Sequence, residues 1–420
     1  MTRVTHWLPR PDFMAILADA ISSPDHAANV RLLTSAAVTA VRRAGGGVEV
    51  DVALSSGAAA TLRPKLLIGA DGAASAVREA LQAWAADGAA PGAAGGSFAQ
   101  KQVECPSAGL RFKVLPLPPN LELRDGTRVP NRAFALLQGR KATALGGAAA
   151  VRLGLLPFKD DRPGRTGNLI TTPDHPIWDV ADGERMYQVL EEALPQADWR
   201  ALVPPAAMAR FAASKGGAFP RPTYSDGAAA AAGGAAVVLL GDALHCFPPD
   251  LGQGVNSALL DVLALDDAIT AATPASSSAS SSASPSAPGA PPAGAVGAGT
   301  GPGGVDLAAL AAEFQRRQLP EARALCELLP LGFPYQYSAS LRRQLWTAVF
   351  LLQTAGNKVA PWLVPPPTFI MIQDNSLNYA AILAKVRQAQ LVGRALLALL
   401  AAVLLPKLAR LALRLSAGAA

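Results

Sequence analysis

The 420-residue sequence predicts an α/β fold: a nucleotide-binding domain, interrupted by a mainly antiparallel β domain and followed by a helical C-terminal region. Two segments, residues 65–81 and 237–262, each read as strand, turn and helix, and they predict the nucleotide-binding domain. The short apolar runs between them lack helical spacing and predict strands. A chain of this length can bury the cores of two domains.

The composition argues against several classes of function. The formal net charge is +6 and the pI is about 9.4, but the basic residues are scattered and no basic run interleaves with aromatic residues, so no nucleic-acid partner is predicted. The cysteines (Cys105, Cys246 and Cys326) lie far apart, and the four histidines form no cluster. We therefore expect neither disulfides nor a metal site.

The first part of the nucleotide-binding domain is expected at residues 1–90. It contains no signal-peptide core, and Pro11 with the apolar spacing of Phe13–Ile21 predicts an early helix. No G-x-G-x-x-G turn precedes Asp71, so we expect either a start upstream or a remnant that lacks this turn. Strands are expected at residues 29–33, 38–42, 48–52 and 65–68, and a helix near Ser75.

The inserted domain is expected at residues 91–224, before the second part of the nucleotide-binding domain at 225–270. Mixed patterning predicts strands at 110–115, 133–138 and 150–155, and a helix at 184–194.

Residues 271–305 are rich in Ser, Ala, Pro and Gly, and they predict a disordered insert because they offer little apolar surface to bury. The C-terminal region, 306–390, is expected to hold helices at 307–329, 341–353 and 379–390, with Pro320 kinking or dividing the first.

The tail, residues 391–415, has twelve uncharged residues from Ala395 to Pro406 between Arg394 and Lys407. A membrane span needs about 20 apolar residues. The shorter run and its basic flanks predict a membrane-associating anchor or interfacial helix. The alternative is a hydrophobic helix packed on the protein.

The most informative segment is residues 237–262. The strand 237–240 runs into Gly241-Asp242, a loop with Pro248-Pro249 follows, and Gly252-Gln253-Gly254 opens a helix. A carboxylate at the end of a parallel strand suits a sugar or ribityl hydroxyl, and a glycine-rich helix start lets N–H groups approach an electron-rich ligand.

This segment resembles the second FAD-contact motif of the class A flavoprotein aromatic hydroxylases, the p-hydroxybenzoate hydroxylase superfamily. Residues 65–81 resemble their Asp-Gly motif, which lies beside the FAD pyrophosphate and serves NAD(P)H. The resemblance implies a Rossmann-type FAD-binding domain, here N-terminally incomplete, with an inserted substrate domain. Its implied cofactor contacts are Arg10, Val38, Asp71, Gly72, Arg78, Gly241, Asp242, Gly252, Gln253, Gly254, Val255 and Asn256.

The resemblance also implies a reaction: O₂-dependent hydroxylation of a small aromatic substrate, with FAD as cofactor and NADPH as reductant, through a flavin C4a-hydroperoxide. The flavin carries this chemistry, so no catalytic side chain is predicted; Pro248 and Pro249 are expected beside the flavin. We expect His245 to pack locally rather than act as a base. Asp261 ends the same motif, but it could instead be an ordinary exposed helix acid, so no role is predicted for it.

Within the superfamily, residues 319–346, 365–367 and 376–385 resemble the kynurenine 3-monooxygenase-like branch. That resemblance implies kynurenine as the substrate, Tyr379 over it, and a C-terminal membrane anchor. It implies the mitochondrial outer membrane, with a plastid as the alternative. A core aromatic is the other interpretation of Tyr379. Two other functions stay open, an epoxidase acting on a lipophilic isoprenoid and a non-catalytic membrane-tethered remnant.

Overall fold

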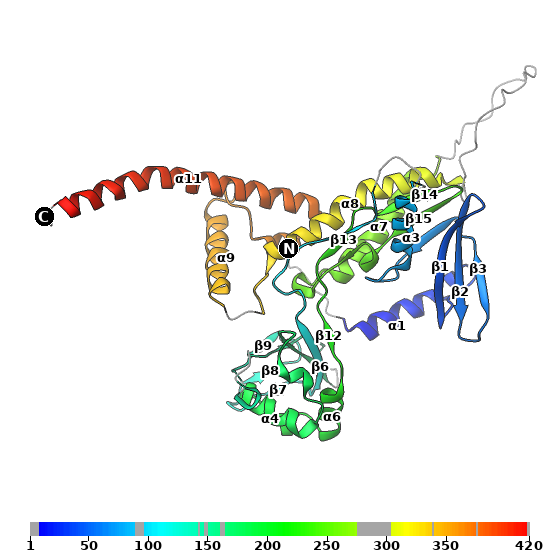
Figure 1. Ribbon diagram of the computed structural model, residues 1–420. Coiled ribbons are helices and arrows are strands. Elements are labelled where there is room, and N and C mark those ends of the chain that lie inside the picture. Colours follow the sequence, from blue (N-terminus) through cyan, green and yellow to red (C-terminus); the bar gives the residue numbers. More distant parts are fainter. Residues whose placement is uncertain are drawn as a thin grey trace, which may run out of the picture. The chain divides into compact units, whose positions relative to one another are not determined.

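The computed structural model describes residues 8–88, 96–141, 143–146, 150–159, 164–274, 304–337, 340–374 and 377–417. The chain forms two compact units, and Figure 1 labels their elements. One unit is built mainly from Ser107–Arg221 and also takes in Met1–Ala37 and Val52–Ala60. The other consists of Val38–Asp51, Thr61–Pro106 and Pro222–Ala420.

The Ser107–Arg221 segment folds around a five-stranded sheet of order β12-β6-β11-β10-β9, in which every pairing is antiparallel. Leu153 of β10 pairs with Leu169 of β11 and Leu137 of β9, so all three side chains join one buried core. Helix α4 (Gly183–Ala193) confirms the helix predicted at 184–194. The strands are β6 (Arg111–Leu117), β9 (Ala135–Gln138), β10 (Arg152–Leu155), β11 (Arg165–Thr171) and β12 (Gly217–Ala218), with a separate hairpin of β7 (Leu121–Glu122) and β8 (Arg128–Val129).

Helices complete this core. Trp199 and Leu190 are fully buried, and the Trp199 indole N–H donates to the Leu194 carbonyl at 2.9 Å, which satisfies its polar atom inside the core. The helices are α4 (Gly183–Ala193), α5 (Trp199–Leu202) and α6 (Pro205–Ala213).

The second unit contains a sheet of order β14-β15-β4, formed by β14 (Ala229–Ala232), β15 (Ala235–Leu239) and β4 (Leu66–Gly69). β15 and β4 are parallel, with Leu239 opposite Gly69, so both strands end at the same edge. All five residues of β15 are buried, as expected for a strand covered on both faces.

Three helices surround this sheet: α3 (Ala76–Ala86), α7 (Gly254–Ala272) and α8 (Leu307–Gly332). α8 lies along β14 and β15, and its buried Gln315 accepts hydrogen bonds from the Ala228 and Ala229 amides at 2.5 and 2.9 Å. α8 is one continuous helix that contains Pro320, so the alternative of two helices divided at this proline is wrong.

A separate three-stranded sheet consists of β1 (Ala36–Ala44), β2 (Gly47–Leu54) and β3 (Ala59–Leu62). Val48, Val50 and Val52 of β2 are buried, which confirms the predicted alternation. The strand predicted at 29–33 is wrong, since these residues are irregular and exposed. They follow α1 (Arg10–Ile21) and α2 (Pro24–Ala27), and a strand forms only where a neighbouring strand pairs with its backbone.

A further small sheet has the order β16-β13-β5, formed by β5 (Gln100–Gln102), β13 (Thr223–Ser225) and β16 (His245–Cys246). The remaining helices are α9 (Leu341–Val359), α10 (Thr368–Ile372) and α11 (Tyr379–Ala417). α9 and α11 continue beyond their predicted ends.

Two segments beside these helices were given predictions: a disordered insert at 271–305 and a membrane-associating tail at 391–415. α7 continues to Ala272, inside the predicted insert, and residues 275–303 of that insert lie outside the described residues. Among the described residues, no helix combines the length and apolar character needed to cross a bilayer. The membrane association predicted for the tail stays a prediction.

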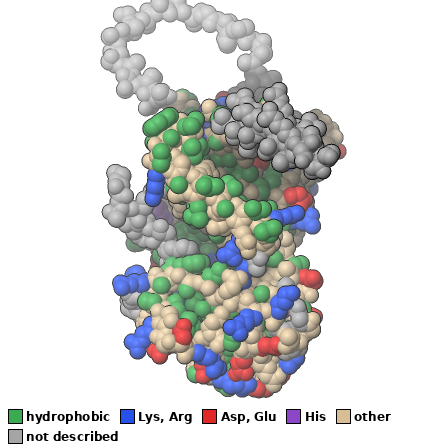
Figure 2. All heavy atoms as spheres, turned by 90° about the vertical axis from the view of Figure 1, so that its left-hand side faces the viewer, with side chains coloured by type: hydrophobic (Ala, Val, Ile, Leu, Met, Phe, Trp, Pro, Cys, Tyr) green, Lys and Arg blue, Asp and Glu red, His purple; other side chains and the backbone are tan. Residues whose placement is uncertain are grey.

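Large hydrophobic side chains are exposed in the C-terminal region. Figure 2 shows hydrophobic side chains on the molecular surface, and the most exposed are Trp362 at 84% and Val359 at 79%.

Candidate functional site

Two turns lie side by side at the carboxyl edge of the parallel pair β15 and β4. The Leu240 amide donates to the Gly69 carbonyl at 2.9 Å, which joins the two strand ends. After β15 the chain turns at Gly241, whose φ is +57°, and the next residue, Asp242, is exposed. A glycine tolerates this left-handed conformation without steric cost. The turn therefore presents a carboxylate at the edge where ligands of open α/β sheets bind.

The turn after β4 contains Asp71 and Gly72. The Asp71 carboxylate accepts hydrogen bonds from the Ser75 hydroxyl at 2.5 Å and the Val77 amide at 3.2 Å. Ser75 in turn accepts from the Arg78 amide at 3.0 Å and forms the N-cap of α3. Asp71 therefore holds the start of α3, a role for which Asp and Ser are the preferred residues.

Arg78 connects the two turns. Its guanidinium donates to the Ala243 carbonyl at 3.1 Å and to the Ala73 carbonyl at 2.9 Å, and the residue is only 4% exposed. Burial lowers the pKa of Arg78. In this structure Arg78 is a scaffold residue, and its contact with FAD stays a prediction.

The start of α7 is open. Gly252 has φ +63°, and a Cβ at Gly252 or Gly254 would meet no atom within 4 Å. Val255 is 54% exposed and Asn256 is exposed, and no side chain caps the helix. The first amides of a helix have no partner within it, so this end offers N–H groups and positive potential to an electron-rich group.

The loop before α7 contains the two predicted prolines. Pro248 is buried, and Pro249 is exposed and begins a short 3₁₀ turn, Pro249–Leu251.

Tyr379 reaches the glycine-rich loop from α11. Its hydroxyl donates to Gln253 Oε1 at 3.0 Å, and Gln253 Nε2 donates to the Leu251 carbonyl at 3.3 Å. Tyr379 is 7% exposed, and burial raises the pKa of its hydroxyl. Tyr379, the predicted substrate residue, is thus hydrogen-bonded to Gln253, a predicted cofactor residue. In this structure the tyrosine is a core aromatic with a hydrogen-bonded hydroxyl, and its contact with a substrate stays a prediction.

Two predicted FAD contacts belong to other elements of the chain. Arg10 is the first residue of α1 and is exposed, but α1 belongs to the other compact unit. Val38 lies in β1 and is 46% exposed. Their roles stay predictions.

Asp261 is a residue that the sequence reasoning missed. The alternative of an exposed helix acid is wrong, because Asp261 is 0% exposed and its carboxylate accepts from the Gly241 amide at 2.7 Å. His245 Nε2 lies 2.9 Å from the same carboxylate and is 2% exposed, which agrees with the predicted packing role. Helical spacing could have found Asp261: it lies four residues before Leu265 and so shares a helix face with this buried side chain.

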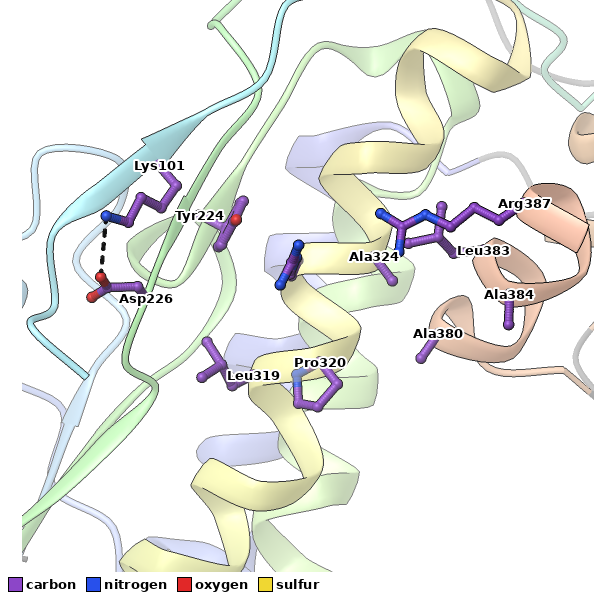
Figure 3. A pocket seen from close by; sticks show the side chains of 11 residues that line it. Lys101, Tyr224, Asp226, Leu319, Pro320, Ala324, Ala380, Leu383, Ala384 and Arg387 are labelled. Carbon is purple, nitrogen blue, oxygen red and sulfur yellow. Dashed lines mark ion pairs between the residues drawn. The ribbon is translucent and has the colours of Figure 1, made fainter. Parts of the chain in front are cut away.

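A pocket of about 530 Å³ lies among β5, β13, α8 and α11 (Figure 3). Lys101 and Asp226 form an ion pair at its edge, with a 3.4 Å N–O distance. None of the residues predicted to bind cofactor or substrate lines this pocket. In the part of the chain that the structure describes, no three His, Cys, Asp or Glu side chains are grouped to hold a metal ion.

Comparison with known proteins supports the flavoprotein resemblance. Residues 2–98 match the family described as FAD binding domain. Kynurenine 3-monooxygenase of Salinispora arenicola (strain CNS-205) is 26% identical over 163 residues, which is 38% of this chain and 28% of that protein. The aligned part thus spans well under two thirds of the relative. These matches confirm the resemblance to the class A FAD-dependent monooxygenases.

Several solved structures are also similar. Anhydrotetracycline hydroxylase OxyS of Streptomyces rimosus gives a TM-score of 0.46 at 15% identity, over 84% of this chain and 56% of that one. PqsL of Pseudomonas aeruginosa, a probable FAD-dependent monooxygenase, gives 0.42 at 20% identity, over 81% and 72%. Klebsiella pneumoniae HpxO complexed with FAD and uric acid gives 0.39 at 16% identity, over 77% and 63%.

Proposed function

We propose that this chain, as a relative of the class A FAD-dependent monooxygenases, binds FAD at the carboxyl edge of β15 and β4 and hydroxylates a small aromatic substrate. The observation that carries the proposal is the pairing of an exposed carboxylate, Asp242, with the open start of α7 beside it in the same motif. Kynurenine is the substrate that the name of the relative suggests. The resemblance of the sequence motifs suggests NADPH as reductant and O₂ as oxidant.

The residues present fit part of FAD. Asp242 would accept hydrogen bonds from ribityl hydroxyls, and the amides of Gly254, Val255 and Asn256 would face an electron-rich edge of the flavin ring. The space above Gly252 and Gly254, where a Cβ would meet nothing, allows a ring to approach the backbone.

Bound flavin would supply the redox chemistry, and the protein would supply binding, orientation and exclusion of water. The positive end of the α7 dipole would favour negative charge on the ring, by about 0.3–1 kcal/mol. Tyr379 and Gln253, which are hydrogen-bonded to each other, would fix the shape of the loop that faces the ring.

The test is the flavin content per chain of the purified full-length protein, measured by flavin absorbance after incubation with excess FAD and removal of free FAD. We expect close to one flavin per chain. The Asp242→Asn variant should bind FAD about tenfold more weakly, because a charged hydrogen bond contributes about 1.5–3 kcal/mol. The matched control is Asp266→Asn, an exposed acid on α7, which should bind as the wild type does. A wild-type protein that retains no flavin would contradict the proposal.

The substrate is tested separately, by following NADPH oxidation with and without kynurenine in the FAD-loaded protein. We expect kynurenine to accelerate oxidation and to be hydroxylated. An FAD-loaded enzyme whose NADPH oxidation is unaffected by kynurenine, while another aromatic compound stimulates it, would overturn the kynurenine assignment and leave the FAD site in place.

A further inference from the structure

The carboxylate of Asp261 is enclosed where three structural elements converge. Its Oδ2 accepts from the Gly241 amide at 2.7 Å and lies 2.9 Å from His245 Nε2, and Oδ1 accepts from Gln318 Nε2. These donors come from the turn after β15, from β16 and from α8. A fully buried carboxylate is strongly unfavourable unless donors surround it, and here three do. The convergence ties α7 to the carboxyl end of β15.

The turn that carries Asp242 is held from two sides. On the amide side, Asp261 fixes the N–H of Gly241, the residue in the left-handed conformation. On the carbonyl side, Arg78 donates to the Ala243 carbonyl at 3.1 Å, and the Leu244 amide donates to the Gly241 carbonyl at 2.9 Å. Asp242 follows Gly241 directly, so a change in the backbone at Gly241 would move the exposed Asp242 side chain.

His245 contacts the Asp261 carboxylate that holds the turn. Its ring lies 5.9 Å from that of Phe247 in a stacked arrangement, and its Nδ1 has no hydrogen-bond partner among the described residues. Its hydrogen bonds are therefore to Asp261, through Nε2. Because a carboxylate only accepts, Nε2 is the donor in this contact. His245 thus orients Asp261 and is enclosed away from the open site.

We propose that Asp261 is a positioning residue for FAD binding: through the Gly241 amide it fixes the turn that presents Asp242 to the cofactor. Asp261 is 0% exposed, so it would act on the cofactor through the turn and not by direct contact. This inference rests on the proposed function, since FAD is the ligand whose affinity it sets.

The first measurement is FAD affinity, from the change in flavin fluorescence on titration with full-length protein. Asp261→Ala leaves the half-buried Gly241 N–H without this acceptor, and we expect a loss of about tenfold, since an unpaired group costs about 1–3 kcal/mol. The control, Asp266→Ala, lies on the same helix but is exposed, and should stay within about twofold of wild type. Asp261→Asn retains an acceptor for the Gly241 amide, so it should restore most of the affinity, which a general loss of packing would not.

The second measurement is hydrogen exchange of the Gly241 amide in the absence of FAD. It should be slow in the wild type and in Asp266→Ala, and faster in Asp261→Ala. Faster exchange with unchanged FAD affinity would overturn this inference alone, whereas a wild type that binds no FAD would overturn the proposed function. If Asp261→Ala does not fold, the wild type still decides: a Gly241 amide that exchanges as fast as that of exposed Asp242 would overturn the proposal.

Discussion

At the scale of single residues, burial separates acids that look alike in the sequence. Asp242 is exposed, Asp71 is committed to the start of α3, and Asp261 is enclosed by donors. Glu321 of α8 is half-buried and accepts from the Ala380 amide at 3.3 Å, at the start of α11. Burial raises the pKa of Glu321, the largest effect on it, while the backbone hydrogen bonds oppose the shift.

Glu321 leads to a prediction about pH. Because its folded pKa is above the ordinary value of 4.5, the folded state favours the protonated form. Its contribution to stability is present below pH 4.5 and is lost as the pH rises through the folded pKa. Replacing Glu321 by Gln removes this titration. We expect the free energy of unfolding, measured by urea denaturation, to fall with pH more steeply in the wild type than in Glu321→Gln.

Glu313, also on α8, provides a control of opposite sign. Hydrogen bonds from Arg316 and then Arg317 lower its pKa to about 2. Its contribution is present above pH 4.5 and is lost as the pH falls toward 2. Glu313→Gln should therefore lose less stability in acid than the wild type does. For Glu321, the contradicting outcome is different: the free energy of unfolding would change with pH in the same way in the wild type and in Glu321→Gln.

At the scale of elements, close packing depends on the absence of a side chain at Gly69. This residue ends β4 beneath α3, and a Cβ there would lie 2.8 Å from Val77 Cβ and 2.9 Å from Leu239 Cδ2. Both neighbours belong to the packed core of the unit, so neither can move freely.

We therefore expect Gly69→Ala to destabilise the protein by about 1–3 kcal/mol through overpacking, measured by urea denaturation. Gly47→Ala in β2 is the matched control, because a Cβ there meets nothing within 4 Å and φ is not positive. Equal stability of the two variants would show that α3 is less closely packed on β4 than the structure indicates.

Helix α9 has two apolar faces with different surroundings. Trp346 packs on Phe333 and Phe350, with ring centroids 4.7 and 5.2 Å apart. On the other face, Leu345 and Leu352 are 61% and 73% exposed.

The double change Leu345→Gln with Leu352→Gln should alter the free energy of unfolding by no more than about 1 kcal/mol, since each exposed position contributes within about 0.5 kcal/mol. Trp346→Ala removes the aromatic contacts and should cost more, about 1–3 kcal/mol for a half-buried ring. A double variant that is destabilised as much as Trp346→Ala would mean that this face of α9 is covered in solution. The measurement is thermal or urea unfolding of each variant.

At the scale of the whole molecule, the two compact units differ in how they are assembled. The core of the Ser107–Arg221 segment comes entirely from that stretch: its buried cluster runs from Leu115 to Ala212. The other unit joins strands from both sides of this segment, since β4 and β15 pair across it. A continuous segment with its own core is expected to fold by itself.

We predict that a fragment containing Ser107–Arg221 gives a cooperative thermal transition by circular dichroism. Leu153→Ala in this fragment should cost about 2–5 kcal/mol because the side chain is fully buried. A broad, non-cooperative transition would show that the segment needs Met1–Ala37 or Val52–Ala60, the other stretches of its unit.

The sequence alone determined the local features of this protein. The strand before Gly241, the helix start at Ser75 and the alternation of β2 depend on neighbouring residues, and all were predicted close to their observed places. Residues 29–33 were predicted to form a strand and do not, because an apolar run becomes a strand only where another strand pairs with it.

The tertiary structure alone decided which residues meet. Tyr379 and Gln253 are 126 residues apart, and Arg78 and Ala243 are 165 apart, yet each pair is hydrogen-bonded. The burial of Asp261 likewise depends on Gln318 of α8 and the Gly241 turn. Periodicity shows which face of a helix an acid occupies, but its charge is enclosed or exposed according to the elements that pack over that face.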